Sequence, residues 1–342
     1  MSKVGIIGHF GGRKNFLDGQ TVKTKTLYQE LKNRGKDIYV VDTYLNNTNK
    51  IKLLINSMIC ILKCDTVIIL LSRNGMQIYF PLMYWAKKML KKKVFHDVIG
   101  GNLTEYVEIY PQYRKYLNAF DENWVEFEQL KIALEKEGVI NCKVIPNFKN
   151  LNLSEAHLKI NDESKHKICM FSRVMKEKGI VDAIETVHNY NEENQYKFHL
   201  NIWGPIEEEF RDEFEEMIEK YPQDFSYKGT VNYNMSVETL TDHIALLFPT
   251  YWKGEGFPGT IIDAYAAGLP VIATDWNANS ELIDNFKTGW VYPNDKCRDL
   301  KSSLEWMALH LDELILMRRN SYEKATCFLP EKWINEILNK ID

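Results

Sequence analysis

The first half of the chain alternates short apolar runs with amphipathic stretches. The predicted strands of this half are Val4 to Gly8, Ile38 to Val41, Thr66 to Leu71 and a run that begins at Val94. Between the first two, the spacing of Val22, Leu27 and Leu31 predicts a helix with one apolar face. Thr66 to Leu71 is apolar and rich in β-branched residues, which is typical of a central parallel strand. Strands that alternate with helices predict right-handed βαβ units and a doubly wound parallel sheet.

A polar segment, Lys149 to Lys165, interrupts this pattern and is predicted to be a linker. The alternation then resumes, with predicted strands at Lys167 to Phe171, Phe198 to Trp203, Ala245 to Phe248 and Val271 to Thr274. We therefore expect an α/β protein with two Rossmann-like doubly wound parallel-sheet domains, residues 1–150 and residues 151–328. A length of 342 residues also favours two domains over one.

The composition is that of a soluble globular protein, with 45% hydrophobic and 26% charged residues. The longest apolar segment, Ile51 to Leu62, is too short to span a bilayer and is expected to be a buried helix. Met1 to Gly5 enters a strand pattern at once, so we expect no secretory signal. With six scattered cysteines and no CxxC pair, these features predict a cytoplasmic protein without disulfides.

The net charge of −4 is unevenly distributed. Residues 1–150 carry 23 Lys and Arg against 14 Asp and Glu (+9), and the remainder carries 20 against 33 (−13). In the basic half, aromatic residues precede a group of lysines: Tyr79, Phe80, Tyr84 and Trp85, then Lys87, Lys88, Lys91, Lys92 and Lys93. This pattern predicts a patch for an anionic membrane surface, which would place the protein peripherally at the inner face of the membrane. The alternative is a helix whose C-terminal lysines complement its dipole. Nucleic acid is not expected as a partner, because no recognisable binding module adjoins the lysines.

The first candidate binding segment of the second half is Phe171 to Gly179. It carries Arg173 and Lys178 between a predicted strand and a predicted helix. In open α/β sheets, ligands bind beyond the carboxyl ends of the strands. A guanidinium and an ammonium group placed there suit a diphosphate, although ordinary surface charge is the alternative explanation.

The second candidate segment, Pro249 to Ala264, has glycines at positions 254, 256 and 259 that let the backbone approach a ligand closely. A helix starting near Gly259 would direct its unpaired N–H groups and its positive dipole end at an anion. Glu255 and Asp263, eight residues apart, would line one cleft and accept hydrogen bonds from sugar hydroxyls. The alternative is a helix N-terminus with favourably placed acids, which leaves the three glycines and the aromatic residues around Glu255 unexplained.

The second half contains four segments in this order, between about residues 165 and 295: FSRVMKEKG, EGFPGTIIDAYAAGLPVIATD, NSELI and TGWV. In order and spacing they resemble the family-4 retaining glycosyltransferases (glycosyl transferases group 1). This resemblance implies two Rossmann-like domains that face each other across a cleft, the glycosyltransferase B fold. The specific element is an E-x7-E signature, and this sequence departs from it with Asp263 in place of the second glutamate. Pro258 and Gly259 also replace the common Gly-Leu pair. The first half is more weakly similar, and Pro330 to Ile341 resembles a terminal helix that returns to the first domain, which would then include residues 329–342.

The resemblance implies a role for each matching residue. Arg173 and Lys178 would hold the donor diphosphate and stabilise its charge as it leaves. Glu255 would orient the donor sugar, and His96 would contact that sugar from the first domain. For His96 the alternative is a strand-terminal histidine bonded to the backbone. The residues implied in donor binding are Gly19, Phe257, Pro258, Gly259, Thr260 and Asp263. Of these, Gly259 and Thr260 would offer backbone N–H groups to the phosphates, and Asp263 would bind the ribose hydroxyls.

The resemblance also implies the type of reaction. Such enzymes retain the anomeric configuration and use no metal, so no cofactor is expected, and the nucleotide-diphosphate sugar is a donor substrate. The diphosphate would depart while the acceptor hydroxyl attacks the same face, its proton passing to the leaving phosphate. The implied acceptor is a saccharide or a lipid-linked glycan, in the assembly of a bacterial surface polysaccharide or glycolipid.

Two other functions are consistent with parts of the sequence. A nicotinamide-dependent dehydrogenase would use the glycine-rich turn after the first strand together with Asp42. However, GIIGHFG is not GxGxxG, and Asp42 lies further along the chain than that fingerprint requires. A non-catalytic nucleotide-sugar-binding subunit is the other alternative, but it would not need Arg173, Lys178 and Glu255 together.

Overall fold

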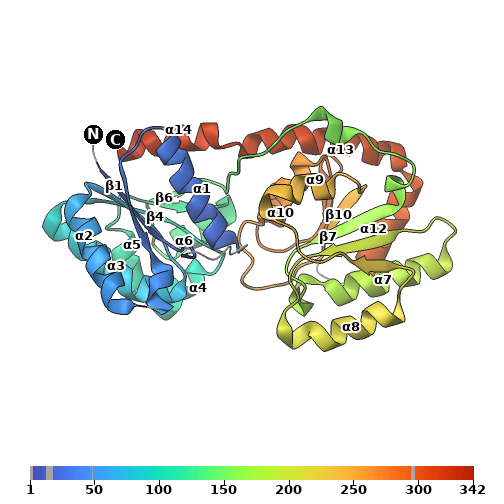
Figure 1. The fold of residues 1–342 in the computed structure, drawn as a ribbon, viewed down its shortest axis with the longest axis horizontal. Helices are drawn as coiled ribbons and strands as arrows, with labels where there is room; N and C mark the ends of the chain where they lie inside the picture. Colours follow the sequence, from blue (N-terminus) through green and yellow to red (C-terminus); the bar gives the residue numbers. More distant parts are fainter. Residues whose placement is uncertain (1–2, 13–17, 48, 294–296) are drawn as a thin grey trace. The chain divides into compact units, whose positions relative to one another are not determined.

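The computed structural model describes residues 3–12, 18–47, 49–293 and 297–342. The chain divides into two compact units (Figure 1). Unit 1 consists of Met1–Asn150 together with Leu329–Asp342, and unit 2 consists of Leu151–Phe328. Among the described residues, no helix combines the length and the apolar character needed to cross a membrane.

Unit 1 is built on a six-stranded parallel sheet with the order β2-β1-β3-β4-β5-β6. Its strands are β1 (Val4–Gly8), β2 (Ile38–Asp42), β3 (Thr66–Leu70), β4 (Lys93–Asp97), β5 (Glu122–Val125) and β6 (Cys142–Val144). Its helices are α1 (Gly19–Asn33), α2 (Lys50–Lys63), α3 (Arg73–Leu90), α4 (Leu103–Ile109), α5 (Gln112–Leu117), α6 (Glu128–Lys136) and α14 (Pro330–Ile341).

Helices cover both faces of this sheet. On one face, α1 and α14 pack together against the strands, with Leu27, Ile334 and Ile337 in one buried cluster with Ile6 and Ile68. On the other face, α2 lies so close to β1 that a Cβ at Gly5 would come within 2.4 Å of the Cys60 sulfur. Only glycine therefore fits at this position of β1.

Unit 2 is built on a second six-stranded parallel sheet, with the order β12-β11-β10-β7-β8-β9. Its strands are β7 (Lys167–Phe171), β8 (His199–Trp203), β9 (Phe225–Tyr227), β10 (Ala245–Phe248), β11 (Val271–Thr274) and β12 (Gly289–Tyr292). Its helices are α7 (Ile180–Glu193), α8 (Arg211–Lys220), α9 (Ser236–Leu240), α10 (Gly259–Ala266), α11 (Asn279–Leu282), α12 (Cys297–Leu309) and α13 (Leu311–Ala325).

Each sheet has a point where the strand order reverses. In unit 1 this point is beside β1, which lies between β2 and β3, and in unit 2 it is beside β7, which lies between β8 and β10. Connections on the two sides of such a point run to opposite faces of the sheet, and the crevice left at the carboxyl ends of the strands is where ligands bind. A ligand site in unit 2 is therefore expected at the edge formed by the carboxyl ends of β7 and β10.

The predicted α/β class with two doubly wound parallel sheets is confirmed. The pattern did not predict β5, β6, β9 and β12, which are only three or four residues long. Such short strands are hard to distinguish from loops by periodicity. One prediction was wrong: Ile51 to Leu62 forms α2, but it is not a buried helix, because the Ile51 side chain is 74% exposed.

Candidate donor-binding site in unit 2

The ends of β7 and β10 bring together three of the predicted residues. Arg173 lies two residues after the end of β7, and Lys178 ends a short 3₁₀ turn before α7. Glu255 lies in the loop between β10 and α10. Residues that are far apart in sequence thus share the carboxyl edge of the sheet at its reversal point, as ligand sites in this class of fold do.

Lys178 and Glu255 form a buried ion pair. The Lys178 ammonium group donates to Oε2 of Glu255, and the two residues are 7% and 6% exposed. The Thr250 hydroxyl donates to the same carboxylate oxygen at 3.0 Å. The Lys178 ammonium group also lies 4.9 Å from the centre of the Trp252 ring. A carboxylate, a hydroxyl and an aromatic ring thus compensate the cost of burying this charge.

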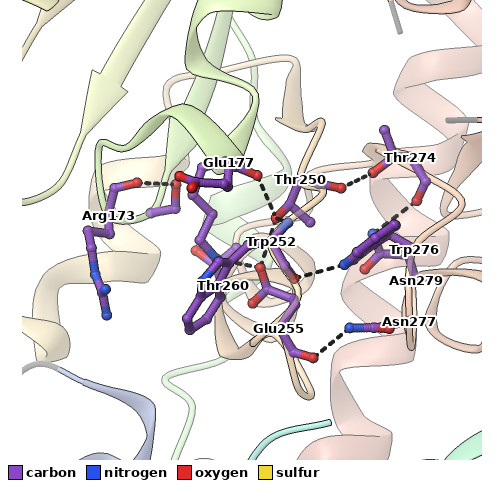
Figure 2. Close-up of polar contacts among 12 residues, drawn as sticks. Arg173, Glu177, Thr250, Trp252, Glu255, Thr260, Thr274, Trp276, Asn277 and Asn279 are labelled. Atoms are coloured by element: carbon purple, nitrogen blue, oxygen red, sulfur yellow. Dashed lines mark hydrogen bonds and ion pairs between the residues drawn. The ribbon is translucent and has the colours of Figure 1, made fainter. Parts of the chain in front are cut away.

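The loop that carries Glu255 is held by residues that follow β11 (Figure 2). The Asn277 side-chain amide donates to the Glu255 carbonyl oxygen at 2.7 Å. The Trp276 indole N–H donates to the Trp252 carbonyl oxygen at 2.8 Å, and the Thr274 hydroxyl donates to the Thr250 carbonyl oxygen. These contacts fix the backbone on both sides of Glu255, so its carboxylate has a defined position before any ligand arrives.

Two glycines allow this close packing of loops. Gly179 has φ +72°, and a Cβ there would come within 2.3 Å of the Pro249 carbonyl oxygen, at the exit of β10. Gly204, after β8, has φ +140°, and a Cβ there would come within 1.7 Å of the Ser172 carbonyl oxygen. Neither position accepts a side chain without moving the backbone next to Arg173 or Lys178.

Arg173 is the accessible cation of the site. Its side chain is 46% exposed, and its guanidinium carbon lies 5.5 Å from the centre of the Trp252 ring. Glu207 is 3.9 Å from the guanidinium group, too far for a strong bidentate ion pair. Trp252 thus contacts both cations of the site, and Arg173 keeps hydrogen-bond donors for an anionic ligand.

Helix α10 begins at the same edge. Its N-cap is Pro258, which makes no side-chain capping hydrogen bond, and the first turn of the helix contains no acidic residue. The Thr260 hydroxyl donates to the Phe171 carbonyl oxygen, which ties the first turn of α10 to the end of β7. The positive end of the helix dipole therefore adds to the charges of Arg173 and Lys178.

The other donor-binding residues predicted in unit 2 lie on the same segment. Phe257 is 7% exposed, and its ring lies 5.7 Å from that of Phe328. Its side chain thus contributes to the interior, and contact of Phe257 with a donor remains a prediction. Asp263 lies one turn into α10 and is 5% exposed. Contact of Asp263 with a ribose remains a prediction.

In unit 1, His96 is completely buried in β4. Its side chain has no exposed surface, and its ring packs 5.0 Å from that of Phe80 on α3. Burial lowers the pKa of His96 to about 3. In the described part of the chain neither ring nitrogen bonds to the backbone, so His96 is not the backbone-bonded histidine of the alternative. The predicted contact of His96 with a sugar thus finds no accessible ring, because the strand points this side chain inward.

Gly19 is the first residue of α1, at the edge where β1 ends. Asp18 caps this helix by accepting from the Thr21 backbone N–H at 3.0 Å, and no described residue lies within 4 Å of where a Cβ of Gly19 would be. A role of Gly19 in binding a donor remains a prediction. Part of the glycine-bearing loop before it, residues 13–17, lies outside the described residues.

A buried charge cluster in unit 1 was missed by the sequence reasoning. The Lys23 ammonium group lies 2.7 Å from an Asp97 oxygen and 2.9 Å from a Glu126 oxygen, and it donates to the Val98 carbonyl oxygen at 2.8 Å. Burial raises the pKa of Asp97 to about 6, against the opposing effect of Lys23. Asp97 directly follows His96 at the end of β4, and a carboxylate at the end of an apolar strand could have indicated the cluster.

Asp42 has a structural role that argues against a dehydrogenase. Its carboxylate accepts from the backbone N–H groups of Phe10, Gly12 and Tyr44, at 2.9, 2.7 and 2.9 Å. In a nicotinamide-binding domain the acidic residue after the second strand binds the ribose. Here it holds the loop after β1 in place.

Comparison with known proteins gives a consistent result. The family model described as glycosyl transferases group 1 matches residues 154–324, which is half of the chain. The Escherichia coli K12 protein named "Putative colanic acid biosynthesis glycosyltransferase WcaL" is 26% identical over 180 residues. That alignment covers 50% of this chain but only 43% of the E. coli protein, so the chain matches less than half of the length of this relative.

Solved structures resemble the chain over its whole length. Sucrose-phosphate synthase from Thermosynechococcus elongatus gives a TM-score of 0.75 at 14% identity and covers 100% of this chain and 99% of its own. Anabaena HepE, solved with UDP and glucose, gives a TM-score of 0.72 at 14% identity, and the match covers 100% of this chain and 99% of HepE. At these identities the likeness shows the fold alone, and it confirms the predicted glycosyltransferase B fold.

Proposed function

The chain belongs to the glycosyl transferases group 1 family, and on this premise we propose that it transfers a sugar from a nucleotide-diphosphate sugar to an acceptor hydroxyl. The observation that carries the proposal is the convergence of Arg173, Lys178 and the N-terminus of α10 at the reversal point of the unit 2 sheet. A diphosphate has the negative charge and the several acceptor oxygens that such a group of donors suits.

In the proposed reaction the bond between the sugar C1 and the diphosphate oxygen breaks, and the nucleoside diphosphate leaves with the bonding electrons. The acceptor hydroxyl forms the new bond at C1 on the same face, and its proton passes to the departing phosphate oxygen. Arg173 and Lys178 would stabilise the charge that develops on the diphosphate, which is the role a metal ion takes in other transferases. The protein groups would thus take the place of a metal, and attack on the face that the diphosphate leaves would retain the anomeric configuration.

Glu255 would orient the donor sugar. Its Oε2 accepts from Lys178 and Thr250, whereas no contact to Oε1 is made within the described part of the chain. Oε1 can therefore accept from a sugar hydroxyl without breaking the ion pair. The hydrogen bond from Asn277 to the Glu255 backbone would hold Oε1 of Glu255 at a fixed position relative to the bound diphosphate.

For the acceptor we propose a saccharide or a lipid-linked glycan in the assembly of a bacterial surface polysaccharide or glycolipid. The E. coli relative, which is named for colanic acid biosynthesis, supports this class. Anabaena HepE binds UDP and glucose, which makes UDP the first nucleotide to test. The net charge of +9 over residues 1–150 favours a cytoplasmic enzyme that works at the inner face of an anionic membrane.

The first experiment measures thermal stabilisation by UDP, GDP, ADP and NADH, with the wild type and with Arg173→Ala. Selective stabilisation by one nucleoside diphosphate, reduced at least about tenfold in apparent affinity by Arg173→Ala, would support the donor site. Arg211→Ala on α8 is the matched control, because Arg211 is 40% exposed, lies in the same unit and pairs with Glu208 and Glu215 on its own helix or next to it. Stabilisation by NADH and by no nucleoside diphosphate would overturn the proposal.

Binding by itself does not distinguish an enzyme from a non-catalytic nucleotide-sugar-binding subunit. A turnover assay makes this distinction. It measures the release of nucleoside diphosphate from the donor identified by binding, in the presence of candidate acceptors. The anomeric configuration of the product, read by NMR, tests the retaining mechanism, and an inverted product would exclude it.

A further inference from the structure

Helix α2 is apolar on two opposite sides. One side, with Leu53, Cys60 and Ile61, is buried against unit 1. The other side carries four aliphatic residues in one stripe, at 74, 57, 53 and 62% exposure: Ile51, Leu54, Ile55 and Leu62. Their spacing of three, four and eleven residues from the first places them on one face of the helix. A surface helix normally buries its apolar residues, and no described part of the chain covers this second apolar side of α2.

Helix α3 continues the same surface. Ile78, Trp85 and Met89 are 54, 41 and 67% exposed, and their spacing also puts them on one face. The two helices lie side by side (Figure 1), joined by a hydrogen bond of 2.8 Å between the hydroxyls of Ser57 and Tyr79. We call the seven exposed residues the α2–α3 face: Ile51, Leu54, Ile55, Leu62, Ile78, Trp85 and Met89.

The charged residues of the two helices themselves all have one sign. Neither α2 nor α3 contains an aspartate or a glutamate. Lys52, Lys63, Lys88 and Lys91 are exposed on or next to these helices, and in the described part of the chain none of them forms an ion pair. A set of apolar side chains with a rim of unpaired lysines is therefore open to solvent.

This surface differs from the patch expected from the sequence. Tyr79 and Phe80 are buried, and Lys87 is paired with Asp121 at 2.6 Å. The apolar part of the surface comes mainly from α2, which the sequence pattern predicts to be a buried helix. Trp85 is the most exposed of the four aromatic residues expected there.

We propose that the α2–α3 face docks unit 1 on the surface of an anionic lipid bilayer. The aliphatic side chains and Trp85 would enter the boundary between headgroups and acyl chains, and the lysines would reach the phosphates above it. Lysine rims favour this occupant over a second copy of the chain. A two-fold interface sets the same surface against itself, and here it would oppose the lysines of one copy to those of the other. The proposal does not depend on the donor site, since all of its residues lie in unit 1, whereas Arg173, Lys178 and Glu255 lie in unit 2.

The test is co-sedimentation of the whole chain with vesicles of phosphatidylglycerol and phosphatidylcholine in equal parts, and with vesicles of phosphatidylcholine alone. The wild type should bind the anionic vesicles at low salt and be released as the salt is raised. Leu54→Gln with Leu62→Gln should weaken binding by about tenfold or more, because two exposed aliphatic groups are lost from the contact. Lys52→Gln with Lys63→Gln should weaken binding to the anionic vesicles by about fivefold per lysine and leave the weak binding to phosphatidylcholine unchanged.

The matched control is Leu309→Gln with Leu316→Gln, on α12 and α13. These leucines are 80% and 63% exposed but belong to unit 2, so their replacement should leave vesicle binding at the wild-type level. All of the substituted side chains are exposed, and unchanged thermal unfolding confirms that each variant is folded. Wild-type protein that stays in the supernatant with anionic vesicles at low salt would overturn the proposal. So would a wild type that is dimeric without lipid and becomes monomeric in the Leu54 and Leu62 variant, because a second copy would then cover the face.

Discussion

The side chains of Lys178 and Glu255, 77 residues apart in sequence, meet in a buried ion pair at the reversal point of the unit 2 sheet. Removing a buried charge from water costs several kcal/mol, and breaking such a pair on one side leaves the other charge uncompensated. The pair is therefore expected to matter for stability and, under the proposed function, for catalysis. The two roles can be separated by experiment.

Lys178→Met and Glu255→Gln are each expected to lower the free energy of unfolding by about 3 kcal/mol, because each leaves one buried charge unpaired. The double variant should recover most of that loss, since neither charge then remains. Transfer activity should be lost in all three variants. Denaturant unfolding and a donor-turnover assay measure the two effects, and a double variant that recovers activity along with stability would contradict the proposed roles.

The exposed pair Lys176 and Glu213 is the matched control for this cycle. Lys176 lies in the same 3₁₀ turn as Lys178, and the two side chains are 59% and 47% exposed. Lys176→Met should change the free energy of unfolding by less than about 1 kcal/mol and should leave transfer intact.

Gly179→Ala should destabilise unit 2 and lower donor affinity together. The residue has φ +72°, and the new Cβ would lie 2.3 Å from the Pro249 carbonyl oxygen, so the turn that carries Lys178 has to move. We expect a loss of roughly 3 kcal/mol, from the left-handed conformation and the backbone clash together. Gly229→Ala, with φ +80° and open space around its Cβ, isolates the conformational part at about 1 kcal/mol. Equal losses in the two variants would show that the contact with Pro249 is not what constrains the turn.

Acid should destabilise unit 1 through His96. Burial lowers its pKa from 6.5 to about 3, so below about pH 6.5 the unfolded chain binds a proton that the folded chain does not. The contribution of His96 to stability is therefore complete above that pH and is lost as the pH falls toward its folded pKa. It should amount to roughly 3 kcal/mol between about pH 7 and pH 4. His96→Leu should flatten the dependence of the unfolding free energy on pH over this range, and an unchanged slope would count against burial of a neutral ring.

His243 in unit 2 provides a second, independent case. It is 3% exposed, and burial lowers its pKa to about 4, so the sign of the effect is the same and its size smaller. His243→Leu should flatten the dependence of the unfolding free energy on pH in unit 2 and leave that of unit 1 unchanged. Hydrogen exchange resolved by domain can measure this difference.

Chelation should leave transfer unaffected. If Arg173, Lys178 and the N-terminus of α10 stabilise the leaving diphosphate, excess EDTA should not change the initial rate of donor turnover by more than about twofold. The control is a metal-dependent transferase assayed in the same buffer. Loss of activity on chelation, restored by Mg²⁺ or Mn²⁺, would assign the leaving-group charge to a metal instead.

Much of the fold was predictable from local pattern. Thr66 to Leu70 and Val271 to Thr274 are apolar runs of strand length between helical stretches, and both are central strands. The loops after β7 and β10 were also predictable as a site, because charges and glycines follow strand ends there. The partners that hold Glu255 in place were not: Trp276 and Asn277 follow a different strand, and nothing in their own segment indicates which carbonyl oxygens they bind.

Which segments become strands and helices, and therefore the class of fold, follows from the sequence, because those preferences depend on neighbours within a few residues. Which groups meet and which are covered depends on how distant segments pack against one another. Glu255 binds Lys178 because the parallel order places β10 beside β7, and His96 is buried because α3 packs over its face of β4. The same holds for α2, whose two apolar sides are equivalent in sequence. The sheet covers one of them, and no described part of the chain covers the other, because a chain buries only the faces that its own layers reach.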